Sequence, residues 1–353
     1  ATGIGGGAAR PANRAAPSPA TRLLRARAAW QNPRTRISRR SLCAVLPVLL
    51  ARPAAASPGG FAGFLDGVRA EARGKGITQA TLAALDGLRP NQDVLARERH
   101  QPEFTMTWAH YQALLVTPAR IAAGRTAYQA HRSLFAAVSR RFGVGPGVIL
   151  GIWGIESNFG ATTGAFHVVD ALATLAWASA RPGFFRAELL DALRILGHGD
   201  VAAVGMTGSY AGAMGQPQFM PSSYLRYAVD FTGDGHRDIW TSVPDVLASI
   251  ANYLARNGWR PGPGWGMAAT APVTDATLLG GPPRSLARWR QVGVAPLSGT
   301  RTPSPDAPLS LVRPAGPAGP AFLVTANFAA IRRYNPSDFY ALAVGLLGDR
   351  ILA

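Results

Sequence analysis

One apolar stretch that ends in a carboxylate constrains this chain more than any other. Pro146 suits the first turn of a helix, because its missing N–H would have no partner there, and Gly160 suits the exit. Steps of three and four residues put Ile149, Ile152 and Glu156 on one helical face, so we expect the carboxyl group to share an apolar stripe. Burial raises the pKa of a carboxyl group and lets a Glu act as a general acid near neutral pH. The spacing equally allows a Glu156 that is paired with an arginine.

The net charge of this 353-residue chain is +17, and it is unevenly placed. Ten arginines and no acidic residue lie within residues 1–56, which leaves +7 for the remainder. A moderately basic protein suits an anionic polymer, although a GC-rich genome that favours Arg gives the same excess. Because most of the excess lies in residues 1–56 and no base-stacking motif accompanies it, we do not expect nucleic-acid binding.

Residues 1–56 have the features of a disordered leader followed by an export signal. Paired arginines occur in Ser38–Leu42, an apolar run continues to Leu50, and three alanines precede Ser57. This pattern predicts export to the periplasm by the twin-arginine route, with the Sec route as an alternative, or else a basic tail on a cytosolic protein. No apolar run after the leader is long enough to span a bilayer, so we expect no transmembrane segment in the mature chain.

The periodicity of the remaining chain predicts an α+β protein that is predominantly α. Residues 57–140 have apolar residues at threes and fours, which indicates a helical lobe, and residues 141–266 form the core that contains Glu156. Residues 267–325 consist of short apolar pieces broken by Gly and Pro, which predicts a small antiparallel β subdomain. Residues 326–353 return to helix and to the core.

A second chemical element is the acidic loop, residues 230–241. Oxygen-bearing side chains at positions one, three, five and nine, a carbonyl at seven and Gly235 at six match the spacing of an EF-hand. Thr241 stands where a bidentate Glu would complete the shell, so we expect a weak Ca²⁺ or Na⁺ site, closed by water or by an acid such as Asp245. The alternative is an Asp-Gly turn that holds no ion. In both cases the loop is structural and joins helices expected at 222–229 and 244–257. The candidate ligands are Asp230, Thr232, Asp234, His236 and Asp238.

Three sequence blocks around Glu156 carry a family resemblance. They read ESNFG at 156–160, DALATLA at 170–176 and GSYAGAMGQPQFMPSSY at 208–224. Together they resemble the lytic murein transglycosylase B family, lysozyme-like enzymes that cleave peptidoglycan, and the resemblance extends from about residue 61 to the C-terminus. It implies a lysozyme-like core at 141–266 and a carbon–oxygen lyase that needs no cofactor for its chemistry. Peptidoglycan glycan strands would be its partner, and we expect a monomer.

The resemblance also implies a mechanism and a set of site residues. Glu156 would protonate the oxygen between N-acetylmuramic acid and N-acetylglucosamine while the muramyl N-acetyl group stabilises the cation. It would then take the proton of the C6 hydroxyl, which leaves a 1,6-anhydro product. No second acid accompanies Glu156 in a matching motif, whereas most glycosidases use two, which suggests substrate assistance. The implied substrate-binding residues are Tyr111, Arg181, Ser209, Gln218, Asn335 and Tyr340, and Trp108 is a further candidate for the wall of the glycan groove.

Several of these assignments have structural alternatives. Ser209 and Gln218 could serve only the backbone of a Gly-rich turn, Trp108 could be a core residue, and Asn335 before Pro336 has the pattern of a helix N-cap. Arg181 matches the first of two arginines that the family often shows, but the second position is a proline. Two other functions stay open: a hydrolytic muramidase of the lysozyme type, and a non-catalytic scaffold that binds the cell wall.

Overall fold

A computed structural model describes residues 60–99, 106–272, 279–298 and 303–353. The leader and export signal predicted within residues 1–56 lie outside the described residues. The first half of the described chain is helical apart from the two-residue strand β1 (Phe166–His167), which pairs with β2 (Thr207–Gly208) of the second half. Its elements are α2 (Gly60–Gly74), α3 (Gln79–Leu82), η1 (Ala83–Leu85), α4 (Gln92–Arg99), α5 (Trp108–Leu115), α6 (Pro118–Ala130), α7 (Arg132–Phe142), α8 (Pro146–Ser157), β1 (Phe166–His167), α9 (Val168–Ala178) and α10 (Pro182–His198).

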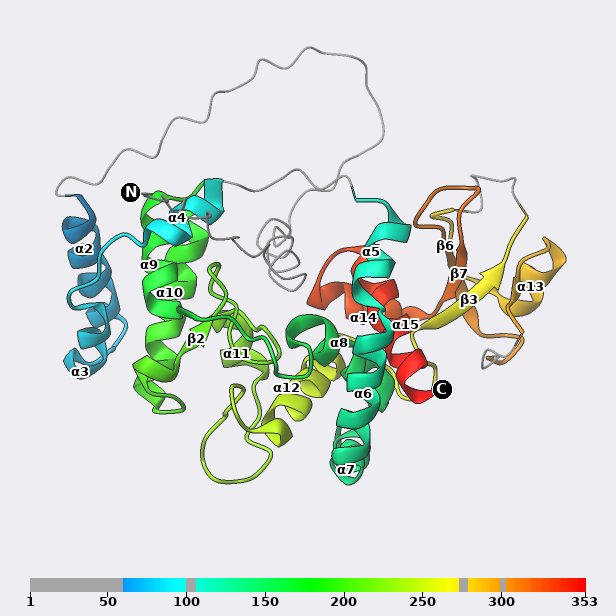
Figure 1. Cartoon of the computed structure of the whole chain (residues 1–353), viewed down its shortest axis with the longest axis horizontal. Helices are drawn as coiled ribbons and strands as arrows, with labels where there is room; N and C mark the ends of the chain where they lie inside the picture. Colours follow the sequence, from blue (N-terminus) through cyan, green and yellow to red (C-terminus); the bar gives the residue numbers. More distant parts are fainter. Residues whose placement is uncertain (1–59, 100–105, 273–278, 299–302) are drawn as a thin grey trace, which may run out of the picture.

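The second half contains more helices and a five-stranded sheet. Its elements are η2 (Ala203–Gly205), β2 (Thr207–Gly208), α11 (Pro221–Tyr227), α12 (Val243–Arg256), β3 (Gly266–Thr270), β4 (Arg284–Ser285), α13 (Leu286–Gln291), β5 (Ala295–Pro296), β6 (Pro308–Val312), β7 (Ala321–Val324), α14 (Ala326–Tyr334) and α15 (Asp338–Leu352). The elements are spread along one long axis, with α2 and α3 at one end, the sheet at the other and α8 and α15 between them (Figure 1).

Helix α8 lies at the centre of the fold. Its residues from Val148 to Ser157 are all buried, so the helix is enclosed on every side and the predicted single apolar stripe is too narrow a description. It packs against α15, α12, α6 and α7. A methyl group at Gly151 would lie 2.1 Å from the carbonyl oxygen of Val344, and one at Gly348 would lie 2.1 Å from that of Gly147. Glycine at these positions therefore lets the backbones of α8 and α15 touch.

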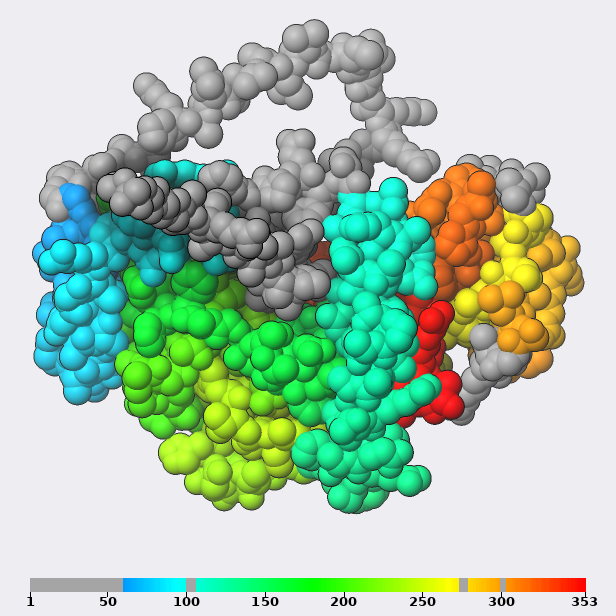
Figure 2. All heavy atoms as spheres, viewed as in Figure 1, coloured from blue at the N-terminus to red at the C-terminus, as the bar shows by residue number. Residues whose placement is uncertain are grey.

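The helical lobe has two parts, which pack on different sides of the core. Helices α2, α3 and α4 pack on α9 and α10, while α5 and α6 pack on α15. In the space-filling view α5–α7 stand in front, beside α15 (Figure 2). At the junction of α4 and α9, Asn91 donates to Asp170 at 2.7 Å and its backbone N–H donates to Thr174 at 3.0 Å. The helical pattern from 118 to 142 is divided into α6 and α7 at His131, whose backbone leaves helical geometry.

The predicted antiparallel sheet is confirmed. The subdomain also contains helix α13, which the sequence pattern did not predict. The strand order is β4-β6-β7-β3-β5, and β7 pairs with β3 and β6 so that Leu323 lies opposite Met267 and Leu311. Helix α13 covers a small core of its own, in which Trp289 donates to the carbonyl of Leu309 at 2.9 Å. Residues 273–278 of this subdomain lie outside the described residues. The predicted division of the chain into five segments stays a prediction.

The C-terminal segment differs from its prediction. It forms two helices, α14 and α15, and Asn335 does not cap the second one: it is the extended residue that ends α14. Ser337 takes the capping role, since its hydroxyl oxygen accepts from the backbone N–H of Tyr340 at 3.3 Å. The backbone N–H of Ser337 donates to the carbonyl of Asn335 at 2.8 Å, so Asn335 and Pro336 belong to the connection between the helices.

Within the described ranges, no individual helix has both the length and the apolar character needed to cross a bilayer. Helices α7 and α8 meet that test only when taken together, and they are bent by 112° at the break between them. The α8 half of this pair is the buried centre of the fold.

Candidate active site

Glu156 lies in the last turn of α8, where the chain leaves the helix through a sharp turn. The residue is 6% exposed. Asn158 and Phe159 adopt positive φ angles of 50° and 59°, and Gly160 follows with 87°. Such angles are costly for residues other than glycine, and they accumulate where a site demands a fixed backbone. The turn thus ends the helix directly after the carboxyl group.

Tyr340 of α15 donates its phenolic hydrogen to Oε1 of Glu156 at 2.7 Å. Tyr340 is 2% exposed, and its ring stacks on that of Tyr334 with centroids 6.5 Å apart. Tyr334 donates in turn to the carbonyl of Pro217 at 2.6 Å, which fixes the ring pair on the Gly-rich loop. Because Oε1 accepts the phenol hydrogen, Oε2 is the oxygen that would carry a transferable proton in the neutral acid.

Tyr111 of α5 lies close enough to Glu156 to respond to its charge. Burial, followed by the negative charge of Glu156, raises the pKa of the Tyr111 phenol. Its ring stacks on Trp108 at 6.4 Å and meets Phe339 edge to face at 5.6 Å. Trp108 is buried against Phe322 and Phe339, so it is a core residue, in agreement with the structural alternative.

Ser209 and Gln218 both hold the backbone of the Gly-rich loop. The hydroxyl oxygen of Ser209 accepts from the backbone N–H groups of Ala211 and Ala213 at 3.3 and 3.0 Å. The amide of Gln218 donates to the carbonyls of Thr163 and Gly215 at 2.8 and 2.7 Å. Gln218 thereby ties this loop to the segment that follows Glu156. These contacts hold the fold of the Gly-rich loop.

Asn335 and Arg181 lie at helix boundaries. Asn335 is buried at the end of α14, three residues before α15 begins. Arg181 immediately precedes α10, and its guanidinium lies 5.1 Å and 5.4 Å from the ring centres of Phe184 and Phe185. The first turn of α10 thus provides a cation–π setting for Arg181, the residue that precedes it.

Helices α11 and α12 lie on either side of the acidic loop, within two residues of the predicted ranges. Both carboxylate oxygens of Asp230 accept from loop N–H groups, those of Gly233 at 2.6 Å and Gly235 at 2.9 Å. Asp238 likewise accepts from the N–H groups of Trp240 and Thr241, each at 2.8 Å. In the part of the chain that the structure describes, no group of three or more His, Cys, Asp or Glu is arranged to hold a metal.

Asp245, the acid suggested above to close the ion site, contacts the backbone of the acidic loop. It is almost fully buried in the first turn of α12, and its oxygens accept from the backbone N–H groups of Phe231 at 2.8 Å and Asp238 at 3.0 Å. Burial raises the pKa of this carboxyl group. Asp245 therefore braces both ends of the acidic loop from beneath. The donor set of the loop remains hard oxygen, which suits Ca²⁺ or Na⁺ in chemical type.

Sequence reasoning missed Gln216, which lies buried between Glu156's helix and the acidic loop. Its side-chain oxygen accepts from the indole N–H of Trp153 at 2.8 Å, and its amide donates to the carbonyl of Trp240 at 2.9 Å. A glutamine in a Gly-rich loop carries no sequence signal for burial, since most glutamines are exposed.

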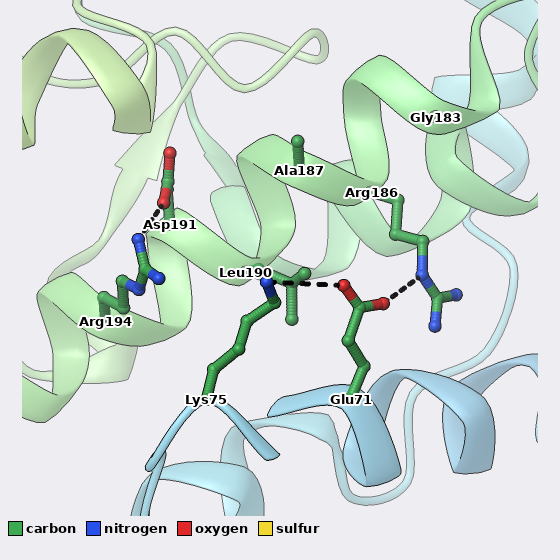
Figure 3. A pocket seen from close by; sticks show the side chains of 8 residues that line it. All are labelled: Glu71, Lys75, Gly183, Arg186, Ala187, Leu190, Asp191 and Arg194. Atoms are coloured by element: carbon green, nitrogen blue, oxygen red, sulfur yellow. Dashed lines mark hydrogen bonds and ion pairs between the residues drawn. The ribbon is translucent and has the colours of Figure 1, made fainter. Parts of the chain in front are cut away.

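A cavity of about 210 Å³ between α2 and α10 is lined by none of the candidate site residues named above (Figure 3). Its charged side chains are paired with one another: Arg186 and Lys75 with Glu71 at 2.7 and 3.8 Å, and Arg194 with Asp191 at 3.0 Å. Ion pairs of this exposed kind contribute little to stability, and they leave the cavity without an unpaired carboxyl group for acid catalysis.

Comparison with known proteins gives one consistent result. Residues 60–349 match the family model described as transglycosylase SLT domain. The membrane-bound lytic murein transglycosylase B of Escherichia coli K12 is 33% identical over 248 residues, which are 69% of this chain and 67% of that protein. SltB3 from Pseudomonas aeruginosa, solved in complex with NAG-anhNAM-pentapeptide, is 43% identical with a TM-score of 0.80, over 84% of this chain and 80% of that one. Escherichia coli Slt35, solved in complex with calcium, is 30% identical with a TM-score of 0.68, over 83% and 92% of the two chains.

Proposed function

Because the chain belongs to the lytic murein transglycosylase B family, we propose that it cleaves the β-1,4 bond between N-acetylmuramic acid and N-acetylglucosamine of peptidoglycan and leaves 1,6-anhydromuramyl ends. Membership makes it an enzyme of the lytic murein transglycosylase class with a lysozyme-like, mainly helical fold. The relative SltB3 was solved with an anhydromuramyl ligand, which supports this choice of product.

The observation that carries the proposal is the buried Glu156 with the Tyr340 hydroxyl on one of its oxygens at 2.7 Å. Burial and the negative, C-terminal end of the α8 dipole both disfavour a charged carboxylate. Glu156 can therefore keep its proton until the glycosidic oxygen of the substrate accepts it. In the first step the proton on Oε2 moves to the glycosidic oxygen as the bond from that oxygen to the muramyl C1 breaks. The phenol of Tyr340 then stabilises the carboxylate that remains.

The second step reverses the role of Glu156. The muramyl N-acetyl group supports the cation at C1, the C6 oxygen forms a bond to C1, and the C6 hydroxyl proton returns to Glu156. Atoms balance without water, and the acid is regenerated. Asp170 does not serve as a second acid in this proposal, because its carboxylate accepts from Asn91 at the junction of α4 and α9. This arrangement supports a single acid/base with substrate assistance.

The acidic loop would hold a structural Ca²⁺ or Na⁺ through Asp230, Thr232, Asp234, the carbonyl of His236, and Asp238. The hydroxyl groups of Thr232 and Thr241 donate to Asp230 and Asp238, and a bound cation would take the place of these hydroxyl hydrogens on the carboxylates. Such an ion would stabilise the connection between α11 and α12. For localisation we propose export to the periplasm, where peptidoglycan is available.

The test is to incubate the protein with purified peptidoglycan and to weigh the released muropeptides. We expect 1,6-anhydromuramyl products from the wild type and none from Glu156→Gln. Glu71→Gln is a matched control, since it changes a carboxylate in the ion-paired cavity of Figure 3 and should leave the products unchanged. Products heavier by one water would support the muramidase instead, and binding without release from any variant would support the scaffold.

A further inference from the structure

We propose that Gln216 is a positioning residue that fixes the end of α8, and with it Glu156, against the acidic loop. This inference rests on the proposed function, because it takes Glu156 as the catalytic acid. Gln216 is 7% exposed, and both ends of its side-chain amide are used. Its oxygen accepts from Trp153 on α8, its nitrogen donates to the carbonyl of Trp240, and its backbone N–H donates to the carbonyl of Ile239 at 2.9 Å.

The contact with Trp153 acts on Glu156 through the helix. Trp153 precedes Glu156 by three residues, so it lies nearly one turn away. The carbonyl of Trp153 also accepts from the N–H of Phe159 at 3.3 Å, beyond the carboxylate. A hydrogen bond to the indole therefore limits rotation of the helical turn that carries Glu156 and of the left-handed turn after it. Catalysis depends on placement at this scale, because a misplacement of about 1 Å can cost about a hundredfold in rate.

The other side of Gln216 is held just as firmly. Met214 and Phe219 exchange backbone hydrogen bonds of 2.7 and 3.1 Å, which closes the turn that presents Gln216. A methyl group at Gly215 would lie 2.5 Å from the carbonyl oxygen of Ile239, so the Gly-rich loop lies directly against the end of the acidic loop. A methyl group at Gly160 would lie 2.6 Å from the side-chain oxygen of Gln216, so a larger residue at position 160 would displace the Gln216 amide.

The acidic loop can therefore influence Glu156 through one side chain. Asp245 holds the loop at Phe231 and Asp238, and the indole of Trp240 donates to the carbonyl of Thr207 at 2.9 Å, beside the start of the Gly-rich loop. Any change in the position of residues 239 and 240 moves the backbone partners of Gln216. Because its amide is shared with Trp153, the displacement is transmitted to the last turn of α8.

Two substitutions at Gln216 separate the hydrogen bonds from the packing. Gln216→Met keeps the length of the side chain and removes both hydrogen bonds. Gln216→Glu keeps an acceptor for Trp153, but when ionised it places a second oxygen against the carbonyl of Trp240, and when protonated it can donate there. Trp153→Phe removes the same bond from the other side. Gln291→Met, on the exposed end of α13, is the matched control.

The experiment combines kinetics on a soluble muropeptide substrate with the indole N–H signals of ¹⁵N-tryptophan-labelled protein. The signal lost in Trp153→Phe identifies Trp153. We expect this signal to shift in Gln216→Met, kcat to fall about tenfold and KM to change less than about twofold, while the melting temperature shows a folded protein. In Gln216→Glu we expect kcat relative to wild type to recover as the pH falls.

Two results would overturn the proposal. One is a shifted Trp153 signal with unchanged kcat, which would make the bridge purely structural. The other is an unshifted signal in Gln216→Met, which would mean that the bond is absent in solution. Failure of the proposed function would give a different result. Activity retained in Glu156→Gln would refute the assignment of the acid, whereas the shift of the Trp153 signal in Gln216→Met does not depend on that assignment.

Discussion

The contact between α8 and α15 gives the sharpest prediction, for Gly151→Ala. The new methyl group would lie 2.1 Å from the carbonyl oxygen of Val344, and ordinary contact begins at 3.4 Å, so the two backbones must separate locally by about 1.3 Å. Since a backbone atom is the obstacle, no rotamer change can relieve it. The displacement lies on the two helices that bring Tyr340 to Glu156.

We expect Gly151→Ala to lower the free energy of unfolding by about 1–3 kcal/mol, the usual cost of overpacking. We expect kcat to fall about a hundredfold, because the hydrogen bond to Glu156 would be stretched or lost. Thermal melts and single-substrate kinetics on a soluble muropeptide measure the two effects separately.

The matched control is Gly67→Ala in the middle of α2. There the nearest atom to a new methyl group is the tip of the Arg186 side chain, 3.7 Å away. This substitution should stabilise the helix by about 0.5–1 kcal/mol and leave kcat unchanged. If Gly151→Ala kept a kcat within twofold of this control, the close contact of α8 and α15 could not be what positions the acid.

Three further predictions follow from single contacts. Tyr340→Phe should fold normally but lose about ten- to a hundredfold in kcat, because a hydrogen bond to a charged group contributes about 1.5–3 kcal/mol; an unchanged kcat would remove Tyr340 from the mechanism. Desolvation beside Trp265 raises the pKa of Asp349, so its ionisation costs stability as the pH rises from about 3.8 through the raised pKa, and the cost is small because the residue is exposed to solvent. Asp349→Asn, which still accepts from Trp265, should therefore melt slightly higher than the wild type at pH 7 and no higher at pH 3; equal gains at both pH values would contradict this. Ca²⁺ at a hundred times its dissociation constant should stabilise the protein by about 2.7 kcal/mol, an effect that Asp230→Asn should reduce and that calorimetry with and without chelator can measure.

Local patterns predicted the elements around Glu156 well. Pro146 begins α8 as expected, but the helix ends at Ser157 with Asn158 as its left-handed cap, before the expected exit at Gly160. The helices on either side of the acidic loop lie within two residues of expectation. These features depend on neighbours in sequence, which periodicity and capping rules describe. That α8 is buried on all sides was not predictable in the same way, because the sequence of such an apolar helix does not show whether one face or all faces are covered.

Features that depend on tertiary contacts were missed or misassigned. Asn335 before Pro336 had the sequence of an N-cap, but the chain used Ser337 instead, since Asn335 ends the preceding helix. The backbone contacts by which Asp245 braces the acidic loop were missed, and its suggested role as a closing ligand stays a prediction. The family resemblance placed Tyr340 among the substrate-binding residues, but its contact with Glu156 was not predicted, because nothing local in either segment indicates that the two side chains meet.

The hydrogen bond between Tyr340 and Glu156 joins residues 184 positions apart, which bears on the order of folding. Loop closure over such a separation is costly in entropy before any contact compensates for it, so long-range pairs tend to form late. The helices of the lobe and α8 can form through contacts between residues close in sequence, before Tyr340 reaches Glu156. Recovery of catalysis during refolding should therefore lag behind recovery of helical circular dichroism, and the chain would acquire its ability to cut peptidoglycan only at its final docking step.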